Sequence, residues 1–234
     1  ATLFARRRRG RRGARRGDDL TRHDGDAALA LFVWREGRGP RAGLRVVPAA
    51  GGYVHATLGD LRAGTRYRYA FAELAEGRPV ARSELGRFRT ALAPDAMEPV
   101  TLGALACVDH GVPQDALARG AELGLDVLGF LGDSAYCDGA VSLCEYREAW
   151  ARTLAPAGYR ALRASTSALA TWDDHEVRND FAGRTVDPTL LAHGRRAFFE
   201  HQPIVRSREA PGRIFRRRRW GRTLEVFVLD LRGE

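Results

Sequence analysis

Four apolar segments in the second half of the sequence each end in a cluster of polar, chemically reactive side chains. Apolar segments of this length predict strands buried on both faces of a sheet. Because ligands collect beyond the carboxyl ends of such strands, the clusters predict one shared site. The segments are residues 100–106, 125–131, 167–171 and 224–229. The residues that follow them are Cys107, Asp109 and His110, then Asp133 and Tyr136, then Asp173, Asp174, His175 and Glu176, and last Asp230 and Arg232.

The string after Trp172, Asp173-Asp174-His175-Glu176, is the most informative of these clusters. A protein core cannot satisfy four consecutive ionisable residues, since buried unpaired charges are costly. Adjacent carboxylates also repel each other unless a cation or an arginine neutralises them. Carboxylate oxygens together with an imidazole suit calcium, magnesium, manganese, iron or zinc ions. The string therefore predicts a metal site, and a solvated loop is the alternative.

Helix signals alternate with these strand segments, which predicts an α/β domain over residues 94–234. The signals are prolines at helix starts, a glycine at a helix end and a reciprocal capping box. The predicted helices run from Pro113 to about Leu123 before Gly124, from Ser142 with Glu145 as its capping partner, and from Asp187-Pro188 to a point before Pro203.

Residues 27–93 have a different pattern, with short apolar or alternating segments separated by glycine, proline and aspartate. Five such segments without a helix predict a small β-sandwich. Nothing in this region assembles catalytic groups, so we expect it to serve packing or recognition. The predicted strands are residues 28–34, 44–47, 53–58, 65–71 and 85–89.

The formal net charge of +9 invites a nucleic-acid-binding interpretation, which the composition argues against. The sequence has no lysine, so all 38 basic residues are arginine, which indicates a compositional bias. The arginine runs at 6–16 and 216–219 have no interleaved aromatic residues to stack on bases. We therefore expect solvated runs, a disordered segment over residues 1–26 and no specific nucleic-acid partner. No stretch approaches the roughly 18 apolar residues that a membrane span needs.

Several stretches together resemble the signature of the alkaline phosphatase D (PhoD-like) family. The strongest runs from Ser142 to Phe181 and includes the string after Trp172. The others are Ala106-Cys107, Gly132-Asp133 with Tyr136, Gln202-Pro203, Arg213-Ile214-Phe215-Arg216 and Leu229-Asp230-Leu231-Arg232. The resemblance implies an α/β fold, a metallophosphoesterase-type layered sandwich (α/β/β/α, incomplete), preceded by a small fibronectin-type-III-like β-sandwich.

The resemblance also implies a site that holds two or more metal ions, commonly iron with calcium. Cys107, Asp133 and Tyr136 would hold the iron, with Asp133 placed to bridge to a second ion. Asp173, Asp174 and His175 would bind that second ion or the phosphate. The implied reaction is hydrolysis of a phosphoric ester by a metal-activated hydroxide. The implied phosphate-binding residues are Arg178 and Arg232, for which a structural ion pair is the equal alternative.

The enzyme so implied is a monomer that is secreted, periplasmic or associated with the cell wall, and its substrate is a small or polymeric phosphate ester. Three cysteines are too few for a disulfide scaffold, and whether Cys137 pairs with Cys144 stays open. Because the later ligands of the family lie beyond the segment ending at Asp230, we expect a chain cut short, with weak metal binding and near-background activity. The alternatives are a non-catalytic arginine-rich module that binds polyanions, or an inactive fragment of the enzyme.

Overall fold

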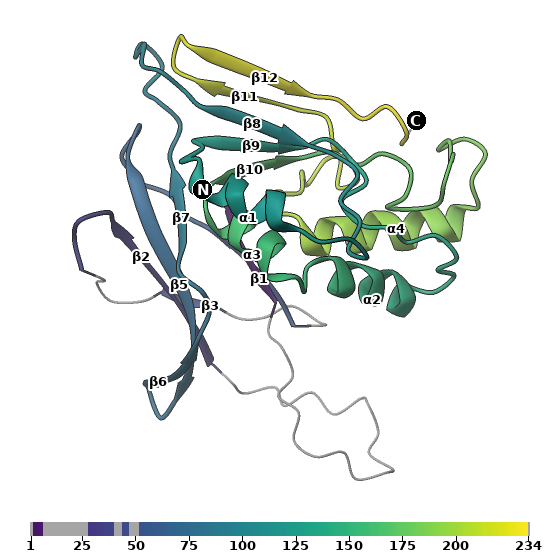
Figure 1. Cartoon of the computed structure of the whole chain (residues 1–234), viewed down its shortest axis with the longest axis horizontal. Coiled ribbons are helices and arrows are strands. Elements are labelled where there is room, and N and C mark those ends of the chain that lie inside the picture. Colours follow the sequence, from purple (N-terminus) through teal and green to yellow (C-terminus); the bar gives the residue numbers. More distant parts are fainter. Residues whose placement is uncertain (1, 7–27, 40–43, 47–51, 234) are drawn as a thin grey trace.

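A computed structural model of the chain describes residues 2–6, 28–39, 44–46 and 52–233. They form a β-rich part from the first half of the sequence and an α/β part from the second half, which lie side by side (Figure 1). No helix in the described ranges is long and apolar enough to cross a membrane.

The β-rich part contains two antiparallel sheets. In the larger sheet β5 is central, with β2 along one edge and both β6 and β7 along the other, while β3 pairs with β2. The smaller sheet pairs β1 with β4. The strands are β1 (Thr2–Arg6), β2 (Ala28–Arg35), β3 (Leu44–Val46), β4 (Tyr53–Thr57), β5 (Arg66–Ala75), β6 (Arg78–Arg82) and β7 (Gly86–Arg89).

The two sheets share one apolar core, as expected for a sandwich. Tyr67 and Phe71 of β5 and Phe88 of β7 pack with Val54 and Ala56 of β4. Arg66 and Arg68, which alternate with Tyr67, are exposed, so the period of two in the sequence identifies the buried face. All five strands predicted in this part are present, although β5 continues further than expected.

Two strands of the β-rich part were not predicted. The expectation of disorder over residues 1–26 is wrong for residues 2–6, where β1 pairs with β4 from Thr2 opposite Thr57 to Arg6 opposite Tyr53. Its sequence, Thr-Leu-Phe-Ala-Arg, has the β-branched and aromatic residues that strands favour, and the arginine run begins only at its end. Residues 7–26 lie outside the described residues. Strand β6 is exposed along its whole length, so it has no alternating pattern to reveal it.

The α/β part has three parallel strands in the order β10-β9-β8. Four helices and an antiparallel hairpin, β11-β12, accompany this sheet. The strands are β8 (Leu102–Leu105), β9 (Val127–Phe130), β10 (Ser167–Ala170), β11 (Arg216–Trp220) and β12 (Leu224–Val228). The helices are α1 (Asp115–Glu122), α2 (Leu143–Thr153), α3 (Ala157–Ala164) and α4 (Pro188–His201).

Successive residues of β9 face opposite layers of this part. Leu128 and Phe130 lie in the main core with the helices, where the ring of Phe130 meets Tyr159 of α3 edge-on. Val127 packs on the other side against Trp220 of β11. The helices therefore cover one face of the sheet and the hairpin lies against the other (Figure 1).

Two expectations about these strands are corrected. Burial on both faces holds for β9 but not for the other three strands, because exposure alternates along β8 and β12 and β10 is half-buried along most of its length. Strand β12, expected to join the other three, pairs with β11 in the separate hairpin. The arginine run at 216–219 forms most of β11, and three of its four side chains are exposed, as expected for a solvated run. Arg216 donates to the Ala170 carbonyl at the end of β10 (2.6 Å), and burial lowers the pKa of Arg216 to about 10.

The predicted starts of α2 and α4 are confirmed at their capping residues, whereas α1 begins at Asp115 and not at the predicted Pro113, with no side-chain cap. Ser142 and Glu145 form the reciprocal capping box of α2, with backbone N–H groups donating to both side chains. The Asp187 carboxylate accepts from the N–H groups of Thr189 and Leu190 at the start of α4. Gly124, with φ of +68°, follows the end of α1 as expected.

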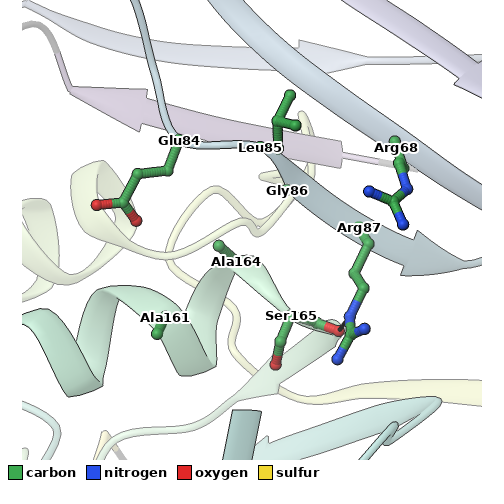
Figure 2. Close-up of a pocket in the computed structure, with 8 residues that line it drawn as sticks. All are labelled: Arg68, Glu84, Leu85, Gly86, Arg87, Ala161, Ala164 and Ser165. Atoms are coloured by element: carbon green, nitrogen blue, oxygen red, sulfur yellow. Dashed lines mark hydrogen bonds between the residues drawn. The ribbon is translucent and has the colours of Figure 1, made fainter. Parts of the chain in front are cut away.

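Asp126, directly before β9, ties the β-rich part to the base of the parallel sheet. Its buried carboxylate accepts from Arg66 of β5 (3.1 Å), from Arg89 of β7 (3.2 Å) and from the N–H of Thr101 (3.1 Å). Arg87 of β7 donates to backbone carbonyls near the ends of α1 and α3, beside a hollow of about 340 Å³ at this junction (Figure 2). The β-rich part is thus held by charged hydrogen bonds to the element that carries the candidate site.

Replacing Asp126 tests this junction. Asp126→Ala leaves Arg89, whose side chain is only 14% exposed, without its buried partner, so the free energy of unfolding should fall by about 2–4 kcal/mol. The control is Glu122→Ala, which removes the exposed pair with Arg119 and should change stability by less than about 0.5 kcal/mol. Urea unfolding measures both variants. Equal effects would show that the Asp126 contacts do not stabilise the junction.

Candidate metal centre

Asp133, Asp174 and His175 converge beyond the carboxyl ends of β9 and β10. One ligand atom of each side chain lies within 4.8 Å of the others. Asp133 and Asp174 are buried and His175 is half-buried. The parallel pairing of β9 with β10 brings the two loops together, as the sequence predicted.

The loops after β8 and β9 both contain residues with positive φ. Gly132 has φ of +122°, and Asp133 and Cys107 have φ of +50° and +56° although neither is glycine. A Cβ atom on Gly132 would lie 2.5 Å from the Cβ of Asp173. Positive φ in residues other than glycine costs about 1–3 kcal/mol each and is typical of functional sites.

Cys107 and Tyr136, both predicted ligands, border the same cluster. The Cys107 thiol donates to Asp133 Oδ2 (3.3 Å), and the Tyr136 ring lies against the His175 ring with 4.4 Å between centroids. The hydrogen bond to Asp133 raises the pKa of the Cys107 thiol, and burial raises the pKa of Tyr136 to about 12. Both groups therefore keep their protons beside these acids, and a cation would be needed to displace them.

The imidazole of His175 is held by a carboxylate that the sequence analysis did not single out. His175 Nδ1 lies 2.6 Å from Asp138 Oδ2, and Asp138 Oδ1 accepts from the N–H of Asn179 (2.7 Å). Burial lowers the pKa of His175, but the hydrogen bond to Asp138 and the negative charges of Asp138, Asp133 and Asp174 together outweigh burial, so the net shift is upward. This contact leaves Nε2 as the ring nitrogen available to a metal ion or a proton.

Asp174 is fixed as an anion by backbone donors. Its carboxylate accepts from the N–H groups of Asp180 (2.7 Å) and His175 (3.0 Å). Burial acts to raise the pKa of Asp174, but these hydrogen bonds and the nearby Arg232 lower it below its ordinary value. The carboxylate is therefore ionised and oriented without any side-chain partner in hydrogen-bond contact.

Of the two candidate phosphate-binding arginines, only Arg232 reaches the cluster. Its guanidinium donates to Asp173 (2.6 Å) and lies 3.6 Å from Asp174, so the structure shows the ion pair that the sequence left open. Asp173, predicted as a ligand, uses one oxygen in this pair. The Arg178 side chain is exposed, and its backbone continues the turn that begins at Asp174.

Glu176 is the most buried member of the string, with no exposed surface. Its carboxylate accepts from the backbone N–H groups of Asp133, Ser134 and Asp173. Burial raises the pKa of Glu176 to about 7, against the effect of these hydrogen bonds. The sequence analysis assigned it no role, although a glutamate directly after a ligand candidate and before a buried valine indicates a carboxylate facing the core.

The residues present suit a metal ion. Asp133 Oδ1 is buried and has no hydrogen-bond partner among the described residues, which is costly unless a cation binds there. Carboxylates, an imidazole, a thiol and a phenol together match hard or borderline ions. The three cysteines are free, so Cys107 is available as a ligand and the Cys137–Cys144 pair is not formed.

This arrangement of converging acids and an imidazole beyond parallel strands defines a candidate metal site. A sequence model described as PhoD-like phosphatase matches residues 114–234. The chain belongs to the PhoD-like phosphatase family.

Known proteins resemble the chain over most of its length. Alkaline phosphatase D of Bacillus subtilis (strain 168) is 28% identical over 217 residues, which is 79% of this chain and 36% of that protein. A structure of PhoD superposes with a TM-score of 0.78 at 24% identity, over 88% of this chain and 45% of that one. The structure of the purple acid phosphatase PPD1 of yellow lupin (Lupinus luteus) superposes with a TM-score of 0.55 at 13% identity, over 84% of this chain and 39% of that one. The chain therefore spans less than half the length of these relatives.

The contact between the two loops gives a test of the site geometry. Gly132→Ala should destabilise the fold by about 2 kcal/mol or more and abolish the convergence of Asp133 with Asp174, because the new methyl group overlaps Asp173. The control is Gly139→Ala, which also has positive φ (+81°) but open space around it, and should cost about 1 kcal/mol. Thermal unfolding and Mn²⁺ binding by calorimetry measure both. Equal stability and equal Mn²⁺ affinity in the two variants would contradict the close approach.

Proposed function

We propose that this chain forms part of a metal-dependent phosphoric ester hydrolase. The observation that supports this most directly is the convergence of Asp133, Asp174 and His175 within 4.8 Å, in a chain of the PhoD-like phosphatase family. Asp133 has a buried oxygen without a hydrogen-bond partner in the described part of the chain, and Asp174 is already ionised and oriented. Such a site favours binding of a cation, and a bound cation attracts an anionic substrate such as a phosphate ester.

Iron and calcium are the metals of this proposal. Cys107 and Tyr136 would hold the iron together with Asp133, because a thiolate and a phenolate suit a redox-capable ion better than calcium. Asp174 and His175, with the free oxygen of Asp173, would hold the second ion, for which carboxylate oxygens suit calcium. Bound metal ions supply a water of lowered pKa and neutralise the charge on phosphate oxygens.

The chain's own residues have separate tasks in this reaction. Asp138 fixes the ring orientation of His175 and favours a proton on Nδ1, so that Nε2 serves the site. Arg232 lies beside Asp173 and Asp174, and its side chain is 31% exposed. It can therefore contact a phosphate oxygen while it keeps its hydrogen bond to Asp173. Burial of Asp174 and Asp133 limits the access of water and strengthens these electrostatic interactions.

The β-rich part belongs to the proposal as a fibronectin-like module that supports the catalytic part. Its charged hydrogen bonds to Asp126 support that role, as does the absence of candidate metal ligands among the residues of this part that the structure describes. Export to the periplasm, the cell wall or the medium, and action as a monomer, are proposed on the family resemblance alone.

The test is hydrolysis of an aryl phosphate monoester and an aryl phosphate diester, with iron and calcium supplied, by a protein that contains this chain and has the full length of its relatives. Asp174→Asn should lower kcat/KM by at least about 100-fold, since it exchanges an oriented anion for a neutral amide, and removal of metal by chelation should have a similar effect. The control is Asp115→Asn on the exposed start of α1, which should leave the rate unchanged.

The same assay can contradict the proposal. Turnover by the metal-loaded protein that survives both chelation and Asp174→Asn would place the reaction elsewhere. Metal analysis of each variant then shows whether the lost activity follows lost metal.

A further inference from the structure

Glu176 lies inside the metal-site string, yet its carboxylate is not among the convergent ligand atoms. The group of side chains that could hold an ion contains Asp133, Asp174 and His175 but not Glu176. Glu176 has no exposed surface, whereas His175 beside it is half-buried. A buried carboxylate is costly unless several donors satisfy it, so its presence here needs a reason.

The donors to Glu176 come from both site loops. Oε1 accepts from the N–H of Ser134 (2.6 Å), and Oε2 accepts from the N–H groups of Asp133 (3.2 Å) and Asp173 (3.0 Å). Asp133 and Ser134 follow β9, and Asp173 follows β10. One carboxylate therefore fixes the backbone of two loops at the residues that carry the candidate ligands.

The backbone at these positions needs such a restraint. Asp133 has φ of +50°, a conformation that residues other than glycine rarely adopt. Gly132 approaches Asp173 so closely that a Cβ atom has no room between the loops. A strained conformation persists only where the surroundings determine it, and the hydrogen bonds to Glu176 act at that point.

We propose that Glu176 is a positioning residue, which holds the loops after β9 and β10 at the separation where Asp133 and Asp174 can share a cation. This inference rests on the proposed metal site and adds a residue to it. Glu176 itself touches neither the metal nor the substrate. Its effect on both passes through the backbone of Asp133 and Asp173.

Glu176→Gln tests the role with little change in volume. The new amide keeps one acceptor oxygen but turns an N–H donor toward backbone N–H groups, so at least one loop loses its anchor. We expect amide hydrogen exchange at Asp133, Ser134 and Asp173 to become at least about 10-fold faster, while the amides of α2 and α4 exchange as before. The affinity for Mn²⁺ should fall by about 10–100-fold, the range known for outer partners of metal ligands.

The matched control is Glu122→Gln, the same chemical change at an exposed residue of α1, which should alter neither measurement. If Glu176→Gln does not fold, Glu176→Asp takes its place, because it keeps the charge while shortening the reach to the three amides. Unchanged exchange at those amides, unchanged Mn²⁺ affinity, or equally faster exchange throughout α2 and α4 would each overturn the positioning role.

Failure of the metal-site proposal has a different signature. If the protein binds no Mn²⁺, or if Asp174→Asn binds it as well as the unchanged protein does, the proposed function fails. The exchange at Asp133, Ser134 and Asp173 then still decides whether Glu176 holds the two loops. Loss of Mn²⁺ binding in Asp174→Asn but not in Glu176→Gln would overturn the inference alone.

Discussion

The crowding of carboxylates beyond the ends of β9 and β10 is the constraint on which the rest of the site depends. Like charges at such short separations repel, and burial increases the effect because water no longer screens them. The negative charge of each aspartate is compensated in a different way. Asp174 accepts backbone N–H groups and Asp173 pairs with Arg232. Asp133 keeps one buried oxygen that no described residue contacts by a hydrogen bond, which is where a cation would stabilise the fold most.

The same constraint explains where the backbone is strained. Cys107 and Asp133 have positive φ at the ends of neighbouring strands, and the N–H groups of Cys107 and Val108 donate to the carbonyls of Gly132 and Asp133. These bonds fix the turn after β8 against the turn after β9. The strain of about 1–3 kcal/mol at each residue is thus offset in part by hydrogen bonds between the two loops. A site of this kind is organised before any ion binds, which reduces the cost of binding.

The sequence predicted the elements better than it predicted their partners. Capping residues such as Ser142 and Asp187 act locally, so the starts of α2 and α4 follow from a few neighbouring side chains. The place of β12 depends on which strand pairs with it, and an apolar segment contains no information about that. Strand β1 was missed because the arginine run after it dominated the composition, although its own residues favour a strand. The convergence of Asp133 with Asp174 was predictable because parallel strands bring their carboxyl ends together.

The roles of single residues in the string after Trp172 were not predictable, since neighbours in the sequence face different partners. The Asp173 side chain contacts Arg232, whereas the side chains of Asp174 and His175 lie near Asp133. The Glu176 side chain is buried and contacts the backbone of the loop after β9. Such divergence requires a tight, irregular turn, in which each side chain leaves the backbone in a new direction. This turn depends on Glu176, because the Glu176 carboxylate accepts a hydrogen bond from the N–H of Asp173 at the start of the same string. One acid of the string therefore holds the backbone of the site, and a count of all its acids overstates the number of groups that can bind a metal.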